Sequence, residues 1–71
     1  MVNVNKLKGK IIEKGYNVAT LSKEIEMDRG TFYRKLNNDG DFSIKEADKI
    51  IDVLCLNLDE VRAIFFSQIV A

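Results

Sequence analysis

The stretch NVATLSKEIEMDRGTFYRKLN, residues 17–37, carries most of the structural information in this chain. Its apolar and small residues recur at the spacing of two short amphipathic helices with a few residues between them. These residues are Leu21, Ser22, Ile25, Met27, Phe32 and Leu36. Asn17 and Asp28 stand where each helix needs an N-cap, because their side-chain oxygens can accept hydrogen bonds from unpaired backbone N–H groups. The stretch therefore predicts helices over about 18–26 and 29–37, joined by a tight turn.

Four residues of the second helix are expected to point away from its apolar side: Arg29, Gly30, Tyr33 and Arg34. Two helices at this spacing form a helix-turn-helix unit, whose second helix can enter the major groove of DNA. The same residues also fit simpler roles. Arg29 and Arg34 are compatible with an ordinary solvated helix face, and Tyr33 with a partly buried flank of the core. Asp28 fits a cap better than a base contact.

The flanking sequence predicts three further helices, so that the whole 71-residue chain forms one compact, all-α, five-helix domain. The first helix is expected to start at a cap, Asn3 or Asn5, and to end before Gly15. A capping box that starts at Ser43 begins the fourth helix, and Asn57 caps the fifth. The residues expected to face the core in these three helices are Val4, Leu7, Ile11, Ile12, Ile44, Ala47, Ile50, Ile51, Leu54, Leu58, Val61, Ile64 and Phe65.

The composition argues against catalysis. The chain has no histidine and a single cysteine, which excludes an internal disulfide, a histidine-dependent triad and a Cys/His zinc site. We therefore expect no catalytic residues, no metal, no cofactor and no enzymatic activity. Cys55 is expected to be a small core residue at the end of the fourth helix. The longest apolar run, 63–66, is too short to span a membrane and no signal segment is apparent, so a cytoplasmic location is expected.

The charges are unevenly distributed along the chain, although the net charge is zero. Residues 1–38 hold eight Lys/Arg and four Asp/Glu, whereas residues 39–71 hold three and seven. The basic half contains the predicted helix-turn-helix. One end of the domain could then face phosphate while the other is repelled by it, which would orient the domain on a duplex. Chance clustering of charge in a small helical protein is the simpler alternative.

The chain resembles the lambda-repressor-like (Cro-type) helix-turn-helix family of phage and bacterial regulators. The resemblance rests on the first helix, the core LSKEIEMDRGTFYRKL and the later pattern IKEADKIIDVLCLNLDEV, and covers nearly the whole chain. The short length and the IFF near the end are similar to small phage-encoded regulators. Two features depart from the family. Glu26 stands where the turn usually has a left-handed glycine, and Asp39 and Asp41 place negative charge in a loop expected near phosphates.

The resemblance implies which residues touch DNA. The base-contacting set would be Asp28, Arg29, Gly30, Tyr33 and Arg34. The phosphate-contacting set would be Asn17, Lys35 and Asn38, with Lys6 and Lys10 as electrostatic support. Arg29 and Arg34 are the strongest candidates, because a guanidinium can bond both O6 and N7 of guanine. Gly30 costs about 1 kcal/mol relative to alanine inside a helix, which close approach to the groove wall would compensate.

The expected function is that of a sequence-specific DNA-binding transcriptional regulator, such as a repressor, of phage or prophage origin. It would bind a double-stranded DNA operator as a homodimer. The alternative is a protein-binding module of the same fold (antirepressor-like) that sequesters a partner repressor, which the zero net charge and the acidic half also fit. Phe66, Ile69 and Val70 are apolar beyond what the last helix needs, and would either complete the core or form a self-association interface.

Overall fold

The computed structural model describes residues 2–65, and within that range the chain forms five α-helices and no strand. The helices are α1 (Val4–Glu13), α2 (Val18–Glu24), α3 (Arg29–Asn37), α4 (Ile44–Leu54) and α5 (Leu58–Phe65). The predicted all-α class and the predicted starts of the helices are confirmed. α2 is shorter than predicted, because it ends at Glu24 and the chain turns away at Glu26.

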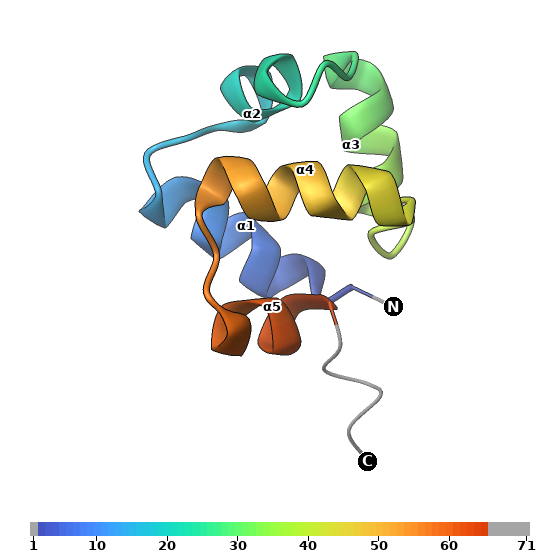
Figure 1. The fold of residues 1–71 in the computed structure, drawn as a ribbon. Helices are drawn as coiled ribbons and strands as arrows, with labels where there is room; N and C mark the ends of the chain where they lie inside the picture. The colour runs from blue at the N-terminus through green and yellow to red at the C-terminus, as the bar shows by residue number, and fades with distance from the viewer. Residues whose placement is uncertain (1, 66–71) are drawn as a thin grey trace.

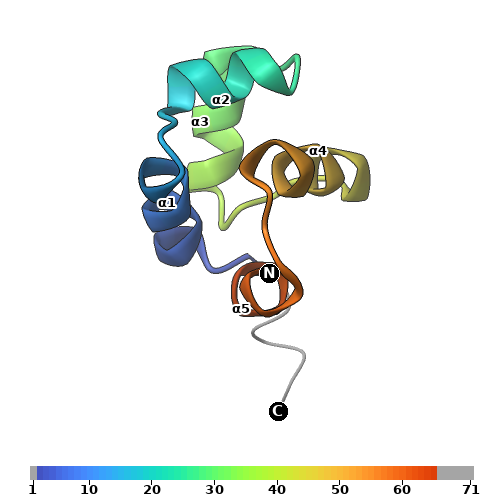
Figure 2. The ribbon, with the colours of Figure 1, turned by 60° about the vertical axis from the view of Figure 1, so that its left-hand side comes forward.

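The helices are arranged so that α2 and α3 lie at one end of the molecule and α5 lies at the other (Figure 1). α4 runs across the middle, in front of α1 in this view. After a turn of 60° the α2–α3 end and α5 are still at opposite ends (Figure 2). α2 packs against α3 and α4, and α1 packs against α5. The described residues of the basic half, 1–38, therefore lie at both ends of the molecule, because α1 packs against α5 while α2 and α3 form the opposite end (Figure 1).

Polar side chains fix where the helices begin. Asn3 caps α1 by accepting a hydrogen bond from the Lys6 N–H at 3.1 Å, while Asn5 lies inside the helix. At the start of α2, Asn17 Oδ1 accepts from the Thr20 N–H at 2.8 Å, and Thr20 Oγ1 accepts from the Asn17 N–H at 2.9 Å. The same reciprocal arrangement begins α4 and α5. These bonds satisfy N–H groups that have no partner within their own helix, so local sequence decides the helix starts.

The core consists of ten apolar side chains that the described helices bury between them. They are Leu7, Ile11, Leu21, Ile25, Phe32, Leu36, Ile50, Leu54, Ile64 and Phe65. Phe32 is fully buried, and its ring centroid lies 5.3 Å from that of Phe42. Burial of one side chain of this size contributes roughly 1.5–3 kcal/mol. The pairing of the two rings connects α3 to the segment that leads into α4.

Three residues expected in the core are on the surface: Ile12, Ile44 and Leu58, with exposed fractions of 74%, 83% and 63%. Ile12 lies about 100° further round α1 than the buried Ile11, which takes it off the packed side. Ile44 and Leu58 are the first residues of α4 and α5, ahead of the turns that enter the core. Periodicity identifies one side of a helix, but it does not say how much of that side a neighbouring helix covers.

α1, α2 and α4 end in the same way, with one residue in the left-handed conformation. This residue is Gly15, Glu26 or Cys55, with φ of 85°, 58° and 51°. In each case the next residue's N–H bonds the carbonyl five positions earlier, which is the Schellman arrangement. The bonded pairs are Tyr16 with Ile11, Met27 with Ser22, and Leu56 with Ile51. The turn between α2 and α3 is therefore closed by backbone hydrogen bonds without a glycine.

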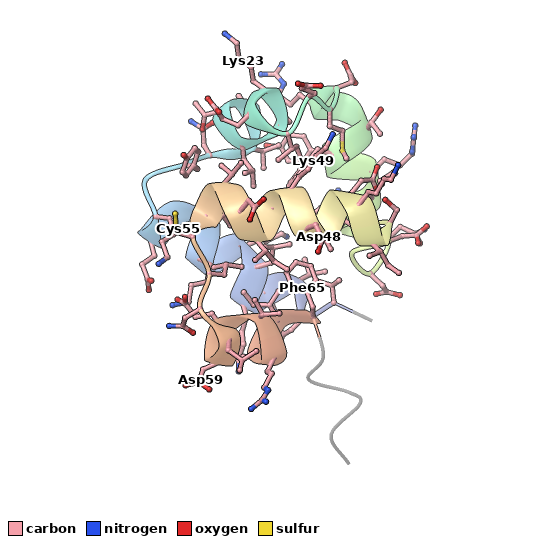
Figure 3. All side chains as sticks on the ribbon, viewed as in Figure 1. Lys23, Asp48, Lys49, Cys55, Asp59 and Phe65 are labelled. Carbon is pink, nitrogen blue, oxygen red and sulfur yellow. The ribbon has the colours of Figure 1, made fainter. Side chains whose placement is uncertain are left out.

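Cys55 is exposed, so the expectation of a core cysteine is wrong. The left-handed backbone at Cys55 reverses the chain direction, and the partly buried Leu56 packs against the core instead. Figure 3 shows Cys55 at the end of α4. An apolar pattern alone does not reveal which residue of a helix end adopts this conformation.

Replacing Glu26 by glycine should raise the free energy of unfolding by roughly 0.5–1 kcal/mol, because glycine avoids the left-handed strain but loses more conformational entropy on folding. The matched control is Glu24→Gly in the regular last turn of α2, where glycine should lower it by up to about 1 kcal/mol. Urea unfolding measures both changes. Effects of the same sign would contradict a left-handed turn at Glu26.

Replacing Gly40 by alanine should destabilise the protein more than replacing Gly15 does. Both glycines have positive φ, but a Cβ on Gly40 would lie 2.5 Å from the Val2 Cβ, whereas one on Gly15 would meet nothing within 4 Å. The extra loss for Gly40→Ala should be about 1–3 kcal/mol, as for other overpacked sites. Urea unfolding of the two variants gives the difference. Equal losses would show that Val2 does not pack against the turn before α4.

Candidate nucleic-acid interface

One side of α3 is available to a ligand. Phe32 and Leu36 face the core, with exposed fractions of 0% and 1%. On the opposite side the side chains are exposed and recur at helical spacing. We call this side the α3 face, and it consists of Arg29, Gly30, Tyr33, Arg34 and Asn37. The packing of α3 therefore groups four of the five predicted base-contacting residues on one surface.

The two arginines of the α3 face have no acidic partner among the described residues. Neither guanidinium forms an ion pair with any residue in the range 2–65. Each keeps its planar fork of N–H donors for an outside acceptor, such as a guanine edge or a phosphate. Tyr33 is 49% exposed, so it offers both its hydroxyl group and part of its ring to a ligand. The face thus combines two cationic forks with one aromatic side chain.

Asp28 and Gly30 also serve the start of α3 itself. Asp28 Oδ2 accepts a hydrogen bond from the Thr31 N–H at 3.2 Å, which confirms the predicted cap. A Cβ on Gly30 would lie 3.1 Å from that same oxygen. A larger residue at position 30 would therefore crowd the capping carboxylate. The capping of α3 by itself is thus a reason for a glycine at this position. Contact of either residue with bases stays a prediction.

Asn17 and Asn38 are exposed residues at two helix ends. Asn17 caps α2 through its side-chain oxygen, which leaves its amide N–H groups available to an outside acceptor. Asn38 ends α3, where its backbone N–H bonds the Arg34 carbonyl at 3.1 Å. Their predicted phosphate contacts are compatible with these positions and stay predictions.

Lys35 is held by an acidic residue of α4. Its Nζ lies 2.8 and 2.6 Å from the two carboxylate oxygens of Glu46. Oε1 of the same carboxylate accepts the Ser43 N–H at 2.8 Å in the capping box of α4. The hydrogen bond from Lys35, followed by that from Ser43, holds the pKa of Glu46 below its ordinary value of 4.5. The sequence does not predict this pair, because its separation of eleven residues matches no helical spacing.

Lys6 and Lys10 lie toward α5. Both line a hollow between α1 and α5 that also includes Glu60. Lys10 Nζ lies 2.7 Å from Glu60 and 2.9 Å from Glu13, and these hydrogen bonds, that to Glu60 first, raise the pKa of Lys10. The bond from Lys10, followed by the Asn57 N–H, lowers the pKa of Glu60. Any electrostatic support that Lys10 gives to phosphate binding is therefore reduced by two neighbouring carboxylates.

The sequence analysis did not assign two residues of this region to a site: Asn37 of the α3 face, and Lys8 of α1 beside it. Lys8 of α1 lines a hollow of about 290 Å³ with Asn17 and Tyr33. It forms no ion pair with a described residue. Asn37 is four positions after Tyr33, so helical periodicity of the second predicted helix could have identified it. Lys8 could not be identified in this way, because its position near Tyr33 depends on how α1 lies beside α3.

The two ends of the molecule do not divide the charge as the sequence counts suggest, because Lys6 and Lys10 of the basic half lie beside α5. Figure 3 shows Lys23 projecting from α2 at one end and Asp59 on α5 at the other. The end formed by α2 and α3 also carries Arg29 and Arg34, which form no ion pair with any described residue. The α3 face therefore offers two arginine side chains to a polyanion, whereas Lys10 at the α5 end is already paired with Glu13 and Glu60.

Other expectations concern residues or ligands away from this face. Phe66, Ile69 and Val70, predicted to complete the core or form an interface, lie outside the described residues. Within residues 2–65, no group of three or more His, Cys, Asp or Glu side chains is placed to hold a metal ion. In the same range no helix has the length and apolar character to cross a membrane.

No family model, curated protein or solved structure matches the chain.

The two carboxylates paired with lysines should make stability depend on pH. Glu46 and Glu60 have folded-state pKa values below 4.5, so their contribution is complete at neutral pH and is lost as the pH falls through those values. The free energy of unfolding should therefore decrease between about pH 5 and pH 3, and decrease less in a Glu46→Gln, Glu60→Gln variant. Urea unfolding across this range tests it, with the exposed Glu24→Gln as control. Equal acid sensitivity of the double variant and the control would contradict the two ion pairs.

Proposed function

We propose that the protein is a sequence-specific DNA-binding transcriptional regulator of the lambda-repressor-like (Cro-type) class. In this proposal α2 and α3 form the helix-turn-helix, and α3 reads the major groove. The observation that carries the proposal is the α3 face, on which two exposed arginines, paired with no acidic residue in the range 2–65, flank a half-exposed tyrosine. Phage or prophage origin rests on the resemblance of the sequence alone.

The side chains of the α3 face match the chemistry of base edges in the major groove. The fork of Arg29 or Arg34 can donate two hydrogen bonds to O6 and N7 of guanine, and the Asn37 amide can pair with N6 and N7 of adenine. Each such pair discriminates against the wrong base by about 1–3 kcal/mol. The ring of Tyr33 supplies apolar surface for a thymine methyl group or a sugar. Together these contacts would read a short sequence of a few base pairs.

The way in which α3 is packed on the rest of the protein also favours direct readout of base edges. The buried Phe32 and Leu36 fix the rotation of α3 about its axis, and the closed turn at Glu26 fixes its direction relative to α2. Side chains that read bases must reach their acceptors within hydrogen-bond distance, so a rigid support improves discrimination. The exposed Asn17 and Asn38 flank the α2–α3 pair in sequence and are suited to contact the phosphates on either side of the groove.

Binding as a homodimer would place two copies of the α3 face about 34 Å apart, one turn of the duplex, on a pseudo-palindromic operator. Occupancy of a promoter by the dimer would then exclude polymerase or a competing regulator. This mode of action places the protein where bacterial DNA lies, in the cytoplasm, and needs neither a cofactor nor a catalytic group.

A second candidate function is sequestration of a partner regulator, as an antirepressor does. One observation favours it: the exposed Ile12 borders the hollow of about 290 Å³ between α1 and α3, beside Val18 and Tyr33. An apolar side chain of a partner regulator would fit this hollow better than a phosphate group would. In that case the hollow would be essential and the arginines of the α3 face would be dispensable.

Replacing Arg29 and Arg34 by alanine, singly and together, tests the first proposal. Selection of bound duplexes from a random pool should give a consensus with the unmodified protein. Each single variant should relax one position of it, and the double variant should recover none, because two bidentate contacts provide about 2–6 kcal/mol of discrimination. Arg62→Ala is the matched control, since Arg62 is an exposed arginine on α5, and it should keep the consensus.

Circular dichroism of each variant must first show an unchanged helical content. If the double variant then recovers the same consensus as the unmodified protein, α3 does not read the bases. If the folded unmodified protein recovers no consensus at all, autonomous sequence-specific binding fails, and capture of a partner regulator through the Ile12 hollow becomes the function to test.

A further inference from the structure

The pairing of Lys35 with Glu46 removes one cation from the edge of the α3 face. Lys35 stands in the last turn of α3, one position after Arg34 and three before Asn38. Its ammonium contacts both carboxylate oxygens of Glu46, at 2.6 and 2.8 Å. The side chains of Lys35 and Glu46 are only 27% and 22% exposed, so the pair is better shielded from solvent than a typical surface pair. Lys35 is therefore already paired with a carboxylate, whereas the neighbouring Arg34 pairs with no carboxylate of the described residues.

Glu46 is held in place by a second interaction. Its Oε1 also accepts the Ser43 N–H at 2.8 Å, and Ser43 Oγ accepts the Glu46 N–H at 3.1 Å. This capping box fixes the carboxylate at the start of α4, directly after the turn that follows α3. A carboxylate that is fixed by the backbone loses little additional freedom when it binds an ammonium, so it competes well with a phosphate for the same lysine.

We propose that Glu46 withholds Lys35 from the DNA backbone and thereby limits the share of affinity that does not depend on sequence. This role of Glu46 rests on the proposed function. Phosphate contacts supply nearly all of the non-specific affinity of DNA-binding proteins, and each contact adds about 0.9 to the slope of log K against log salt. A regulator with fewer such contacts is held less by random DNA, while base contacts of the α3 face are unaffected.

Glu46→Gln separates this role from a structural one. Glutamine keeps the capping box, because its side-chain oxygen also accepts the N-cap N–H, but it has no charge to hold Lys35. Glu60→Gln is the matched control. Glu60 occupies the same capping-box position in α5, binds Lys10 at 2.7 Å, and gives the same change in net charge when replaced. A general gain of positive charge would act equally in both variants.

The experiment is a fluorescence anisotropy titration of a consensus duplex and a random duplex over a range of salt concentrations. Glu46→Gln should steepen the salt slope by about 0.9 on both duplexes, which is about a 3.5-fold larger loss of affinity for each fourfold rise in salt. Glu60→Gln should leave the slope unchanged, because Lys10 still pairs with Glu13 at 2.9 Å and lies beside α5, away from the α3 face. Lys35→Gln should have no effect on the slope of the unmodified protein, but should cancel the increase when it is combined with Glu46→Gln.

Three results would overturn the inference while leaving the proposed function intact. The slope of Glu46→Gln could equal that of the unmodified protein, or Glu60→Gln could steepen it equally. Alternatively, Lys35→Gln alone could reduce the slope by about 0.9, which would mean that Lys35 leaves Glu46 and contacts phosphate on binding. If no variant binds either duplex at any salt concentration, the proposed function itself fails and the role of Glu46 fails with it.

Discussion

Burial of Phe32 and Leu36 is the constraint on which the rest of the structure depends. Because these two side chains of α3 are buried in the core, only the opposite side of this short helix can contact a ligand. The ring of Phe42 packs against Phe32, and this contact determines where the chain leaves α3 and enters α4. The α3 face, the position of Glu46 and the shape of the turn between them all follow from how α3 is seated on the core.

The helix starts and the core of the α2–α3 pair could be predicted from sequence, because both depend on local chemistry. A cap such as Asn17 or Asp28 acts within three residues of its own position, and Phe32 lies at the centre of a regular apolar spacing. The exposed Ile12 and the left-handed Cys55 could not be predicted in this way. Both depend on which part of a helix its neighbours cover and on how the chain turns afterwards.

The same distinction explains which parts of the candidate site were recognisable. Arg29 and Arg34 could be identified because they belong to one helix and need no distant partner. Lys35 could be placed on that helix, but its commitment to Glu46 depends on the turn between α3 and α4. A cluster of basic residues in a sequence therefore overstates the charge that a surface offers, since tertiary contacts decide which of those residues already have an acidic partner.

The most direct test of the account is to locate the DNA on the protein. Amide chemical shifts of the labelled protein would be recorded during titration with the duplex recovered by selection. We expect the largest changes over α3 and around Asn17, with little change over α5. Changes confined to α4 and α5, or centred on Ile12 with α3 unaffected, would contradict the central claim that the exposed face of α3 is the surface that reads DNA.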